Sequence, residues 1–253
     1  MTGVLQDKVA IVTGAGKGLG RAVAEALDAE GAIVVVSDID ETAAKDVAAA
    51  LSRGEAVACD VRDEAAVQAL VEGTVARHGR LDVAVANAGI GVVQPIATMS
   101  LADWRNVTSV NLDGVFLTVR HSALAMAAGG GGSIITMASI TGLAGSALLA
   151  NYAAAKAGVI NLTKTAAVEF RAHGVRVNAV CPGFIDTELV RVAKPDFEAA
   201  LGIDLDAVIA GAQGRYGEVG DVAPLVVFLA SDRSRFSTAG AFIADGGSRA
   251  SLL

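Results

Sequence analysis

Thr13-Gly14-Ala15-Gly16-Lys17-Gly18-Leu19-Gly20 is the stretch that decides the fold of this chain. It follows a β-branched run, residues 8–13, and enters an alanine-rich segment of helical period, residues 19–30. Glycines let the backbone turn tightly and approach phosphates, and a helix N-terminus supplies free N–H groups and a positive dipole end. In this strand-to-helix context we expect the loop to hold the pyrophosphate of a dinucleotide rather than to form an ordinary turn. The residues assigned to this role are Gly14, Gly16, Gly18, Leu19 and Gly20.

The alternation of strand and helix patterns continues along the chain. Strand patterns cover residues 8–13, 32–37, 56–60, 81–86, 133–138, 176–181 and 241–244, and helical patterns cover residues 19–30, 41–53, 64–78, 101–128, 152–172 and 221–230. Several strands are apolar at consecutive positions, which is typical of strands covered on both faces. Strand followed by helix, repeated, predicts parallel pairing with right-handed crossovers. We therefore predict a Rossmann-like, doubly wound α/β fold, with a parallel sheet of about seven strands flanked by helices on both faces.

The length of the chain favours a single domain. With 253 residues, one core can bury most of the apolar surface, so residues 1–253 are predicted to form one NAD(P)-binding domain. Residues 186–217 interrupt the alternation, since they have mixed charge, Pro195, several glycines and no strand pattern. Placed after the sixth strand, this segment is predicted to be a mobile lid over the substrate.

Composition excludes several classes of protein. Charged residues make up 19% and apolar residues 53%, which is incompatible with disorder. The net charge of −7 argues against nucleic acid or an anionic membrane as a partner. Residues 121–155 contain no charge, but glycines and polar residues interrupt them, so burial or a subunit contact explains this stretch better than a membrane span does. The first eight residues show no basic region followed by an apolar run, so we expect no signal peptide and a cytoplasmic protein.

The cysteines and histidines show no metal-binding spacing. Cys59 and Cys181 lie in apolar contexts and are predicted to be buried free thiols. The three histidines, His78, His121 and His173, are scattered along the chain. We therefore expect no metal site.

Three residues form a candidate proton-transfer group. Ser139 closes the fifth predicted strand, and Tyr152 and Lys156 lie in the first turns of the next helix. Four residues make one helical turn, so Tyr152 and Lys156 share a face. At the carboxyl end of a parallel sheet, that face looks into the crevice where ligands bind.

These residue types suit hydride transfer between an alcohol and a ketone. A tyrosine titrates near pH 10 when unperturbed, and a nearby ammonium group is expected to lower the pKa of Tyr152. Tyr152 could then take the alcohol proton as hydride leaves and return it in the reverse direction. Ser139 would hydrogen-bond the substrate oxygen and hold it in line.

The spacing of Gly14, Gly18 and Gly20, with Gly16 as an extra glycine, resembles the short-chain dehydrogenase/reductase family, and the resemblance extends to about Gly247. The family's Asn-Asn-Ala-Gly motif is matched by Asn87-Ala88-Gly89, with Ala86 in place of the first asparagine. The resemblance implies that Asn111 is a fourth catalytic residue, which positions a water linking Lys156 to solvent, and that Lys156 also reaches the nicotinamide ribose. It further implies cofactor contacts from Asp60 and Val61 at the adenine and from Pro182, Gly183, Ile185 and Thr187 at the nicotinamide.

The choice between NAD and NADP depends on the residues after the second strand. Asp38 could accept hydrogen bonds from the adenosine ribose of NAD and would repel the 2′-phosphate of NADP. In the family, a basic residue at the position of Lys17 can hold that phosphate, which is the counter-evidence. Ile39 stands where an arginine would help NADP. We expect NAD, with NADP the less favoured cofactor.

The residues beside this chemistry are mostly apolar, so an apolar secondary alcohol or its ketone is the expected substrate; these residues are Val92, Val93, Leu143, Leu148, Leu149, Phe184 and Leu189. About half of them are expected to belong to the core or to an interface. Two alternatives stay open: an NADPH-dependent 3-oxoacyl thioester reductase, which Lys17 favours, and a dinucleotide-binding protein without catalysis. Relatives usually form tetramers, which implies a homo-oligomer here.

Overall fold

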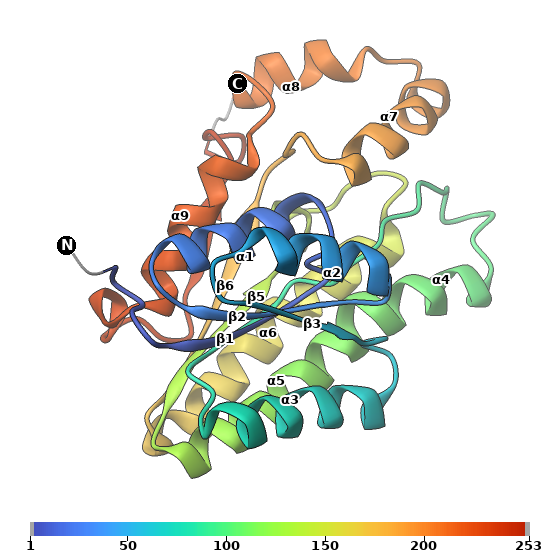
Figure 1. The fold of residues 1–253 in the computed structure, drawn as a ribbon. Coiled ribbons are helices and arrows are strands. Elements are labelled where there is room, and N and C mark those ends of the chain that lie inside the picture. Colours follow the sequence, from blue (N-terminus) through green and yellow to red (C-terminus); the bar gives the residue numbers. More distant parts are fainter. Residues whose placement is uncertain (1–2, 251–253) are drawn as a thin grey trace.

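The computed structural model describes residues 3–250, and its centre is a seven-stranded sheet in the order β3-β2-β1-β4-β5-β6-β7 (Figure 1). All neighbouring strands pair in parallel. The strands are β1 (Val9–Thr13), β2 (Ile33–Asp38), β3 (Gly54–Ala58), β4 (Val83–Ala86), β5 (Gly132–Met137), β6 (Val175–Pro182) and β7 (Ala241–Ala244). Each overlaps a predicted strand, and the predicted doubly wound α/β fold is confirmed.

Helices cover both faces of the sheet. One layer contains α1 (Gly18–Ala29), α2 (Glu41–Ala50) and α9 (Val219–Ala230), and the other contains α3 (Glu64–His78), α5 (Gly114–Gly129) and α6 (Ala150–Phe170), as Figure 1 shows. The buried side chains accordingly divide into two large clusters, one beneath each layer. A sheet covered on both faces explains why its strands are apolar at consecutive positions.

Strand β1 shows how one short run serves both clusters. All five of its residues are buried. Ile11 packs in the cluster beneath α3, α5 and α6, whereas Ala10 and Val12 pack in the cluster beneath α1, α2 and α9. Successive side chains of a strand point to opposite faces of the sheet. Since both faces are buried here, the odd-numbered and the even-numbered positions of β1 must both be mainly apolar.

The strand order reverses at β1. The chain runs from β1 outward through β2 to β3 and then returns to place β4 on the other side of β1. In open parallel sheets, ligands bind outside the carboxyl ends of the strands at such a reversal. Gly14 follows β1 and Asn87 follows β4, so the glycine loop and the Asn87-Ala88-Gly89 segment meet at this point.

The helix predicted over residues 101–128 is interrupted. It consists of α4 (Leu101–Thr108), a π-helical turn (Ser109–Asp113) and α5. A capping box between Ser100 and Asp103 starts α4. Wide helical turns of this kind are rare and are frequently found at functional sites, and this one contains Asn111.

The segment predicted as a lid contains two helices that its sequence pattern did not reveal. They are α7 (Glu188–Leu201) and α8 (Leu205–Gln213), and Figure 1 shows them apart from the two layers that flank the sheet. Pro195 lies inside α7, where a helix is not expected because proline lacks the N–H donor. The mobility of this lid stays a prediction.

Several compositional expectations can be compared with the structure. Cys59 and Cys181 are free and buried, as predicted. Within residues 3–250, no three His, Cys, Asp or Glu side chains gather where they could hold a metal ion. None of the helices in that range has both the length and the hydropathy that a bilayer crossing requires.

Candidate active site

A cleft with a volume of about 640 Å³ runs along the carboxyl ends of the strands. This volume is within the range of sites that hold cofactors. All but one of the residues predicted to contact the cofactor line it, namely Gly14, Lys17, Gly18, Leu19, Gly20, Asp38, Ile39, Asp60, Val61, Asn87, Ala88, Gly89, Tyr152, Lys156, Pro182, Gly183, Ile185 and Thr187. Gly16 is the exception, and its backbone N–H instead donates to Asp38 Oδ2 at 2.8 Å.

The glycine loop packs too closely against neighbouring backbone to accept a side chain at Gly14 or Gly20. Gly14 has a φ of +62°, and a Cβ there would lie 2.7 Å from the Cα of Ala88. A Cβ on Gly20 would overlap the carbonyl oxygen of Gly14. Lys17 precedes α1, and its side chain makes no capping bond. It therefore leaves the N–H groups in the first turn of α1 available to a ligand. The loop therefore fits the pyrophosphate of a dinucleotide.

Asn87 joins this loop to the neighbouring strand. Its side-chain amide donates to the carbonyl oxygens of Thr13 at 2.9 Å and Gly14 at 3.0 Å. Its backbone N–H donates to Thr13 Oγ1 at 3.1 Å. These bonds hold the ends of β1 and β4 together beneath the cleft.

Asp38 and Lys17, the charged residues on the two sides of the phosphate loop, bind different kinds of partner. The carboxylate of Asp38 lines the cleft and accepts hydrogen bonds from the backbone of Gly16 at 2.8 Å and Asp40 at 3.0 Å. The Nζ atom of Lys17 forms an ion pair with Glu188 at 2.9 Å, which joins the loop to the start of α7. Glu188 is a cleft residue that the sequence did not reveal, because it comes from the lid, far along the chain from its partner Lys17.

Asp60 also lines the cleft, and its carboxylate is paired with the guanidinium group of Arg62. Its carboxylate accepts from Arg62 Nε at 2.9 Å and from Arg62 Nη2 at 2.6 Å. The guanidinium group holds the pKa of Asp60 below its usual value. Arg62 itself lines the cleft and was missed by sequence reasoning, although it stands only two residues from Asp60.

The three residues of the candidate proton-transfer group come together at one end of the cleft. Ser139 follows β5, and Tyr152 and Lys156 lie in the first two turns of α6. Ser139 and Tyr152 line both the cleft and a second, apolar pocket, so they stand at the junction of the two. The Nζ atom of Lys156 donates to the carbonyl oxygen of Met137 at 2.7 Å and lies 5.5 Å from the centroid of the Tyr152 ring.

Burial, and not the neighbouring ammonium group of Lys156, has the largest effect on the pKa of Tyr152. It raises the pKa of Tyr152 to about 12, although a hydrogen bond with Ser139 acts in the opposite direction. Burial also lowers the pKa of Lys156 to about 8. The expectation that Lys156 by itself lowers the pKa of Tyr152 is wrong for this structure. The physical reason is that both groups are desolvated, and Lys156 is bound to Met137 above the face of the ring.

Replacing Lys156 with methionine is expected to stabilise the folded protein. The folded pKa of Lys156, about 8, lies below the unfolded value of 10.5, so at neutral pH its buried charge costs about 3 kcal/mol. The unfolded chain binds more protons between these two pH values, so the stability of the wild type rises with pH across that window. We therefore expect the advantage of the variant to be largest at pH 7 and to shrink towards pH 10.

Thermal unfolding at several pH values measures this effect. The matched control is Lys164→Met, in the same helix, whose side chain is exposed. An equal change in melting temperature for both variants, independent of pH, would contradict the prediction.

Asn111 does not line the cleft. It is fully buried, and its side-chain amide accepts from the backbone N–H of Ile90 and donates to the carbonyl oxygen of Ile90, both at 2.8 Å. A Cβ on Gly89 would lie 3.4 Å from Asn111 Oδ1 and 3.6 Å from Lys156 Nζ. The absence of a side chain at Gly89 therefore leaves a space that both of these polar atoms border.

The second pocket is apolar and has a volume of about 80 Å³. Of the apolar residues predicted beside the chemistry, Val93, Leu149, Phe184 and Leu189 line it, whereas Val92, Leu143 and Leu148 do not. Besides Leu189, the lid helices contribute four lining residues that sequence reasoning missed, namely Val190, Ala193, Phe197 and Leu205. Within residues 3–250, the lining of this pocket includes no lysine, arginine or histidine.

Comparison with known proteins agrees with this geometry. Residues 14–249 match the model of a family described as enoyl-(acyl carrier protein) reductase. The chain is 44% identical to cis-4-hydroxycyclohexanecarboxylate dehydrogenase of Sinomonas cyclohexanicum, over 95% of this chain and 96% of that protein. It is 38% identical to cyclohexanol dehydrogenase of Acinetobacter sp. (strain SE19), over 97% and 96% respectively. The crystal structure of levodione reductase superimposes with a TM-score of 0.92 at 35% identity and covers 98% of this chain and 100% of that one.

These relatives are named as dehydrogenases and reductases, which leaves the alternative of a non-catalytic binding protein without support. The fold, the glycine loop and the Ser139, Tyr152 and Lys156 group agree with the same assignment. The chain belongs to the short-chain dehydrogenase/reductase family and is an oxidoreductase that acts on CH–OH groups with a nicotinamide cofactor.

Proposed function

We propose that the protein is an NAD-dependent dehydrogenase that interconverts a compact, neutral secondary alcohol and its ketone. The observation that carries this proposal is the position of Ser139 and Tyr152 at the junction of the cofactor cleft and the apolar pocket. An alcohol seated in the pocket would present its oxygen to both hydroxyl groups and its carbon to the cleft.

Tyr152 is the residue that moves the proton in this proposal. The Ser139 hydroxyl, whose Oγ accepts from the backbone of Thr141 at 3.2 Å, donates to the substrate oxygen and fixes its position. During oxidation, the O–H proton of the alcohol passes to Tyr152 Oη while the C–H bond breaks; during reduction, Tyr152 returns the proton to the oxygen. When bound, the nicotinamide accepts or supplies the hydride.

Lys156 and Asn111 support the tyrosine. The positive charges of Lys156 and of the oxidised nicotinamide favour the phenolate and offset the burial that raises the pKa of Tyr152. Lys156 also lines the cleft where the ribose of the cofactor would lie. We place a water in the space beside Gly89, between Asn111 Oδ1 and Lys156 Nζ, as the proton path to solvent.

The pocket favours a neutral, compact substrate. Its lining is apolar apart from the hydroxyl groups of Ser139, Thr141 and Tyr152, and its small volume suits a single ring better than a long acyl chain. A carboxylate placed there would lose its hydration without a cation to pair with, which is costly. We therefore expect a substrate closer to that named for the cyclohexanol dehydrogenase than to the hydroxy acid named for the other relative.

A panel of alcohols tests this function. Cyclohexanol, cis-4-hydroxycyclohexanecarboxylate and a 3-hydroxyacyl thioester are each offered with NAD and with NADP, and formation of the reduced cofactor is followed by absorbance. We expect the largest kcat/KM for cyclohexanol with NAD. A preference for the carboxylate or the thioester would overturn the proposed substrate class.

An NADPH-dependent reductase of 3-oxoacyl thioesters is the second candidate function. Two observations favour it: Lys17 lines the cleft beside the phosphate loop, and the chain is 37% identical over 96% of its length to a 3-oxoacyl-[acyl-carrier-protein] reductase of Salmonella typhimurium. Asp38, at the adenosine end of the cleft, opposes it.

Replacing Glu188 with glutamine is expected to increase the use of NADP by a few-fold. Glu188 neutralises Lys17 in an exposed ion pair, so its loss frees the ammonium group for a 2′-phosphate; exposed pairs are weak, which limits the gain to about fivefold. The ratio of kcat/KM for the two cofactors measures the effect. Glu25→Gln, which breaks the exposed Arg21–Glu25 pair of α1, should leave the ratio unchanged. An unchanged ratio in both variants would show that Lys17 does not contact the phosphate.

We also propose that the protein is a cytoplasmic homo-oligomer and that the oligomer is a tetramer. Three large apolar side chains are exposed on adjacent helices, Phe116 and Leu124 on α5 and Val168 on α6, and Ile243 is exposed on the edge strand β7. Exposed apolar surface of this kind is typical of subunit contacts. Light scattering at micromolar concentration measures the mass, and a monomer would contradict the proposal.

A further inference from the structure

Gln213, the last residue of α8, makes three side-chain hydrogen bonds to the backbone of neighbouring segments. The residue is 7% exposed. Its Oε1 accepts from the backbone N–H of Phe184 at 2.9 Å, and its Nε2 donates to the carbonyl oxygen of Phe184 at 2.9 Å and to that of Arg215 at 3.0 Å. The amide therefore pairs with both backbone groups of one residue, as a neighbouring strand would.

Phe184 is bound in this way at the boundary between the two halves of the site. It lines the apolar pocket but not the cofactor cleft, whereas Gly183 before it lines both. The segment continues in a short parallel bridge between Ile185 and Gly217, in which Gly217 N–H donates to the carbonyl oxygen of Phe184 at 2.9 Å. The side-chain amide of Gln213 adds two further hydrogen bonds to the backbone of Phe184 beside this bridge. The Phe184 ring packs among apolar residues of the lid helices.

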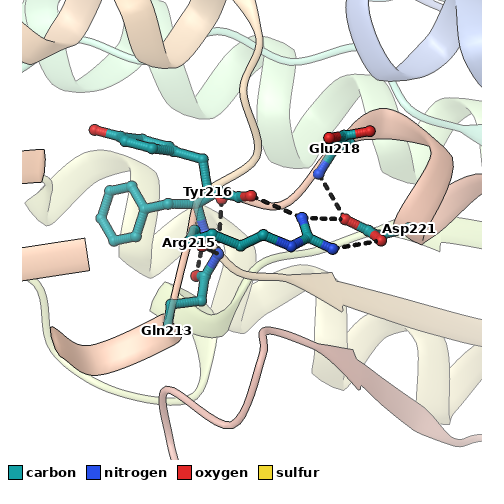
Figure 2. Close-up of polar contacts among 6 residues, drawn as sticks. Gln213, Arg215, Tyr216, Glu218 and Asp221 are labelled. Carbon is teal, nitrogen blue, oxygen red and sulfur yellow. Dashed lines mark hydrogen bonds and ion pairs between the residues drawn. The ribbon is translucent and has the colours of Figure 1, made fainter. Parts of the chain in front are cut away.

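The other end of the contact is anchored to the body of the protein. Figure 2 shows Arg215 paired with Asp221, whose carboxylate oxygens lie 2.7 and 2.9 Å from the guanidinium nitrogens. Asp221 also accepts from the backbone N–H of Glu218 at 2.7 Å and lies in the first turn of α9. Because α9 packs on α1 and on the sheet, this exposed ion pair links Arg215, whose carbonyl oxygen accepts from Gln213, to the body of the protein.

We propose that Gln213 is a positioning residue of the substrate pocket: it fixes the backbone of Phe184, and with it the ring that walls the pocket, without touching the substrate. Its space is closely fitted, since a Cβ on Gly183 would overlap Gln213 Oε1. Any alcohol that contacts the Phe184 ring would therefore depend on this amide. The inference deepens the proposed function and relies on it for the substrate.

Replacing Gln213 with leucine is expected to raise KM for the alcohol by about tenfold, because the N–H of Phe184 loses its partner and its C=O keeps only the bond from Gly217 N–H. The values of kcat and of Kd for NAD should change by less than about threefold, since the ring does not line the cofactor cleft. Asn178→Leu is the matched control. Asn178 is fully buried in β6, and its amide likewise joins two backbone groups, donating to Ser237 at 2.8 Å and accepting from Gly240 at 3.1 Å. The control should lose stability with KM unchanged.

Replacing Gln213 with glutamate separates positioning from mere stability. An ionised carboxylate can accept from Phe184 N–H but cannot donate to the carbonyl oxygens of Phe184 and Arg215, whereas a protonated carboxyl offers one donor and one acceptor. We expect a raised KM at pH 8.5 that returns towards the wild-type value as the pH falls to 6. The charged neighbours are Arg215 and Asp221, which pair with each other, and Asp245, which binds backbone N–H groups of Gly247 and Arg249.

The outcomes decide the inference in each case. A wild-type KM in Gln213→Leu together with a lower melting temperature, as in the control, would show a structural role only and overturn the proposal. If Gln213→Leu fails to fold, the pH response of Gln213→Glu decides. If the wild type oxidises none of the alcohols, the proposed function fails; hydrogen exchange at the amide of Phe184 then decides, since it should accelerate in Gln213→Leu and not in Asn178→Leu, and equal rates would refute the role of Gln213.

Discussion

Replacing Tyr152 with phenylalanine is expected to lower kcat by about a thousandfold or more while Kd for NAD changes by less than about threefold. The phenol lies at the junction of cleft and pocket, where it can exchange a proton with the substrate oxygen, and positioned acid–base catalysis contributes about 10² to 10⁴ in rate. The ring itself stays, so the wall of the pocket and the packing of α6 are retained. Steady-state kinetics with cyclohexanol and titration with NAD measure the two quantities.

Tyr216→Phe is the matched control, because Tyr216 is the second of the two tyrosines in the chain. Its hydroxyl donates to Asp206 Oδ1 at 2.9 Å, at the base of α8, and does not line the cleft or the apolar pocket. Loss of this bond should reduce kcat by well under tenfold. If Tyr152→Phe retained a tenth of the wild-type kcat, the proton would have another route and the mechanism proposed here would be wrong.

The fold could be predicted because its signals are local. The apolar run of β1 has to fill two clusters at once, and Gly14 and Gly20 stand where a Cβ would collide with the backbone. Both constraints can be recognised in a few consecutive residues of the sequence. The lid helices left a weaker trace, because α7 contains Pro195 and has a single buried residue, Phe197, so little of its pattern reports on packing.

The sequence predicted that three side chains of the candidate site lie together, but it did not predict the electrostatics there. Ser139, Tyr152 and Lys156 come together as expected because the end of β5 and the start of α6 meet at the carboxyl edge of the sheet. The pKa of Tyr152 depends instead on burial, which is produced by the whole fold and cannot be deduced from spacing. For the same reason, the partners of Lys17 and Phe184, which come from residues 188 and 213, were out of reach of motif analysis.

Exchanging Asp38 for serine and Ile39 for arginine together is expected to reverse the cofactor preference. In the wild type, the carboxylate of Asp38 lines the cleft, and two unit charges about 4 Å apart repel by roughly 4 kcal/mol at a surface-like dielectric, which amounts to about a thousandfold in favour of NAD. The serine removes this repulsion and can still accept from one of the two backbone N–H groups that Asp38 binds. The exposed position of Ile39 lets an arginine reach a 2′-phosphate without repacking the core.

The ratio of kcat/KM for NAD and NADP measures the reversal, and Asp40→Ser separates it from a general change in surface charge. Asp40 lies two residues from Asp38, is exposed, and caps α2 by accepting from the backbone of Ala43 at 3.1 Å, a role that serine also performs well. It does not line the cleft, so its replacement should leave the ratio within about threefold of the wild type. A wild type that uses NADP as well as NAD would show that Lys17 outweighs Asp38. In that case the second candidate function, an NADPH-dependent reductase of 3-oxoacyl thioesters, would explain the cofactor use better.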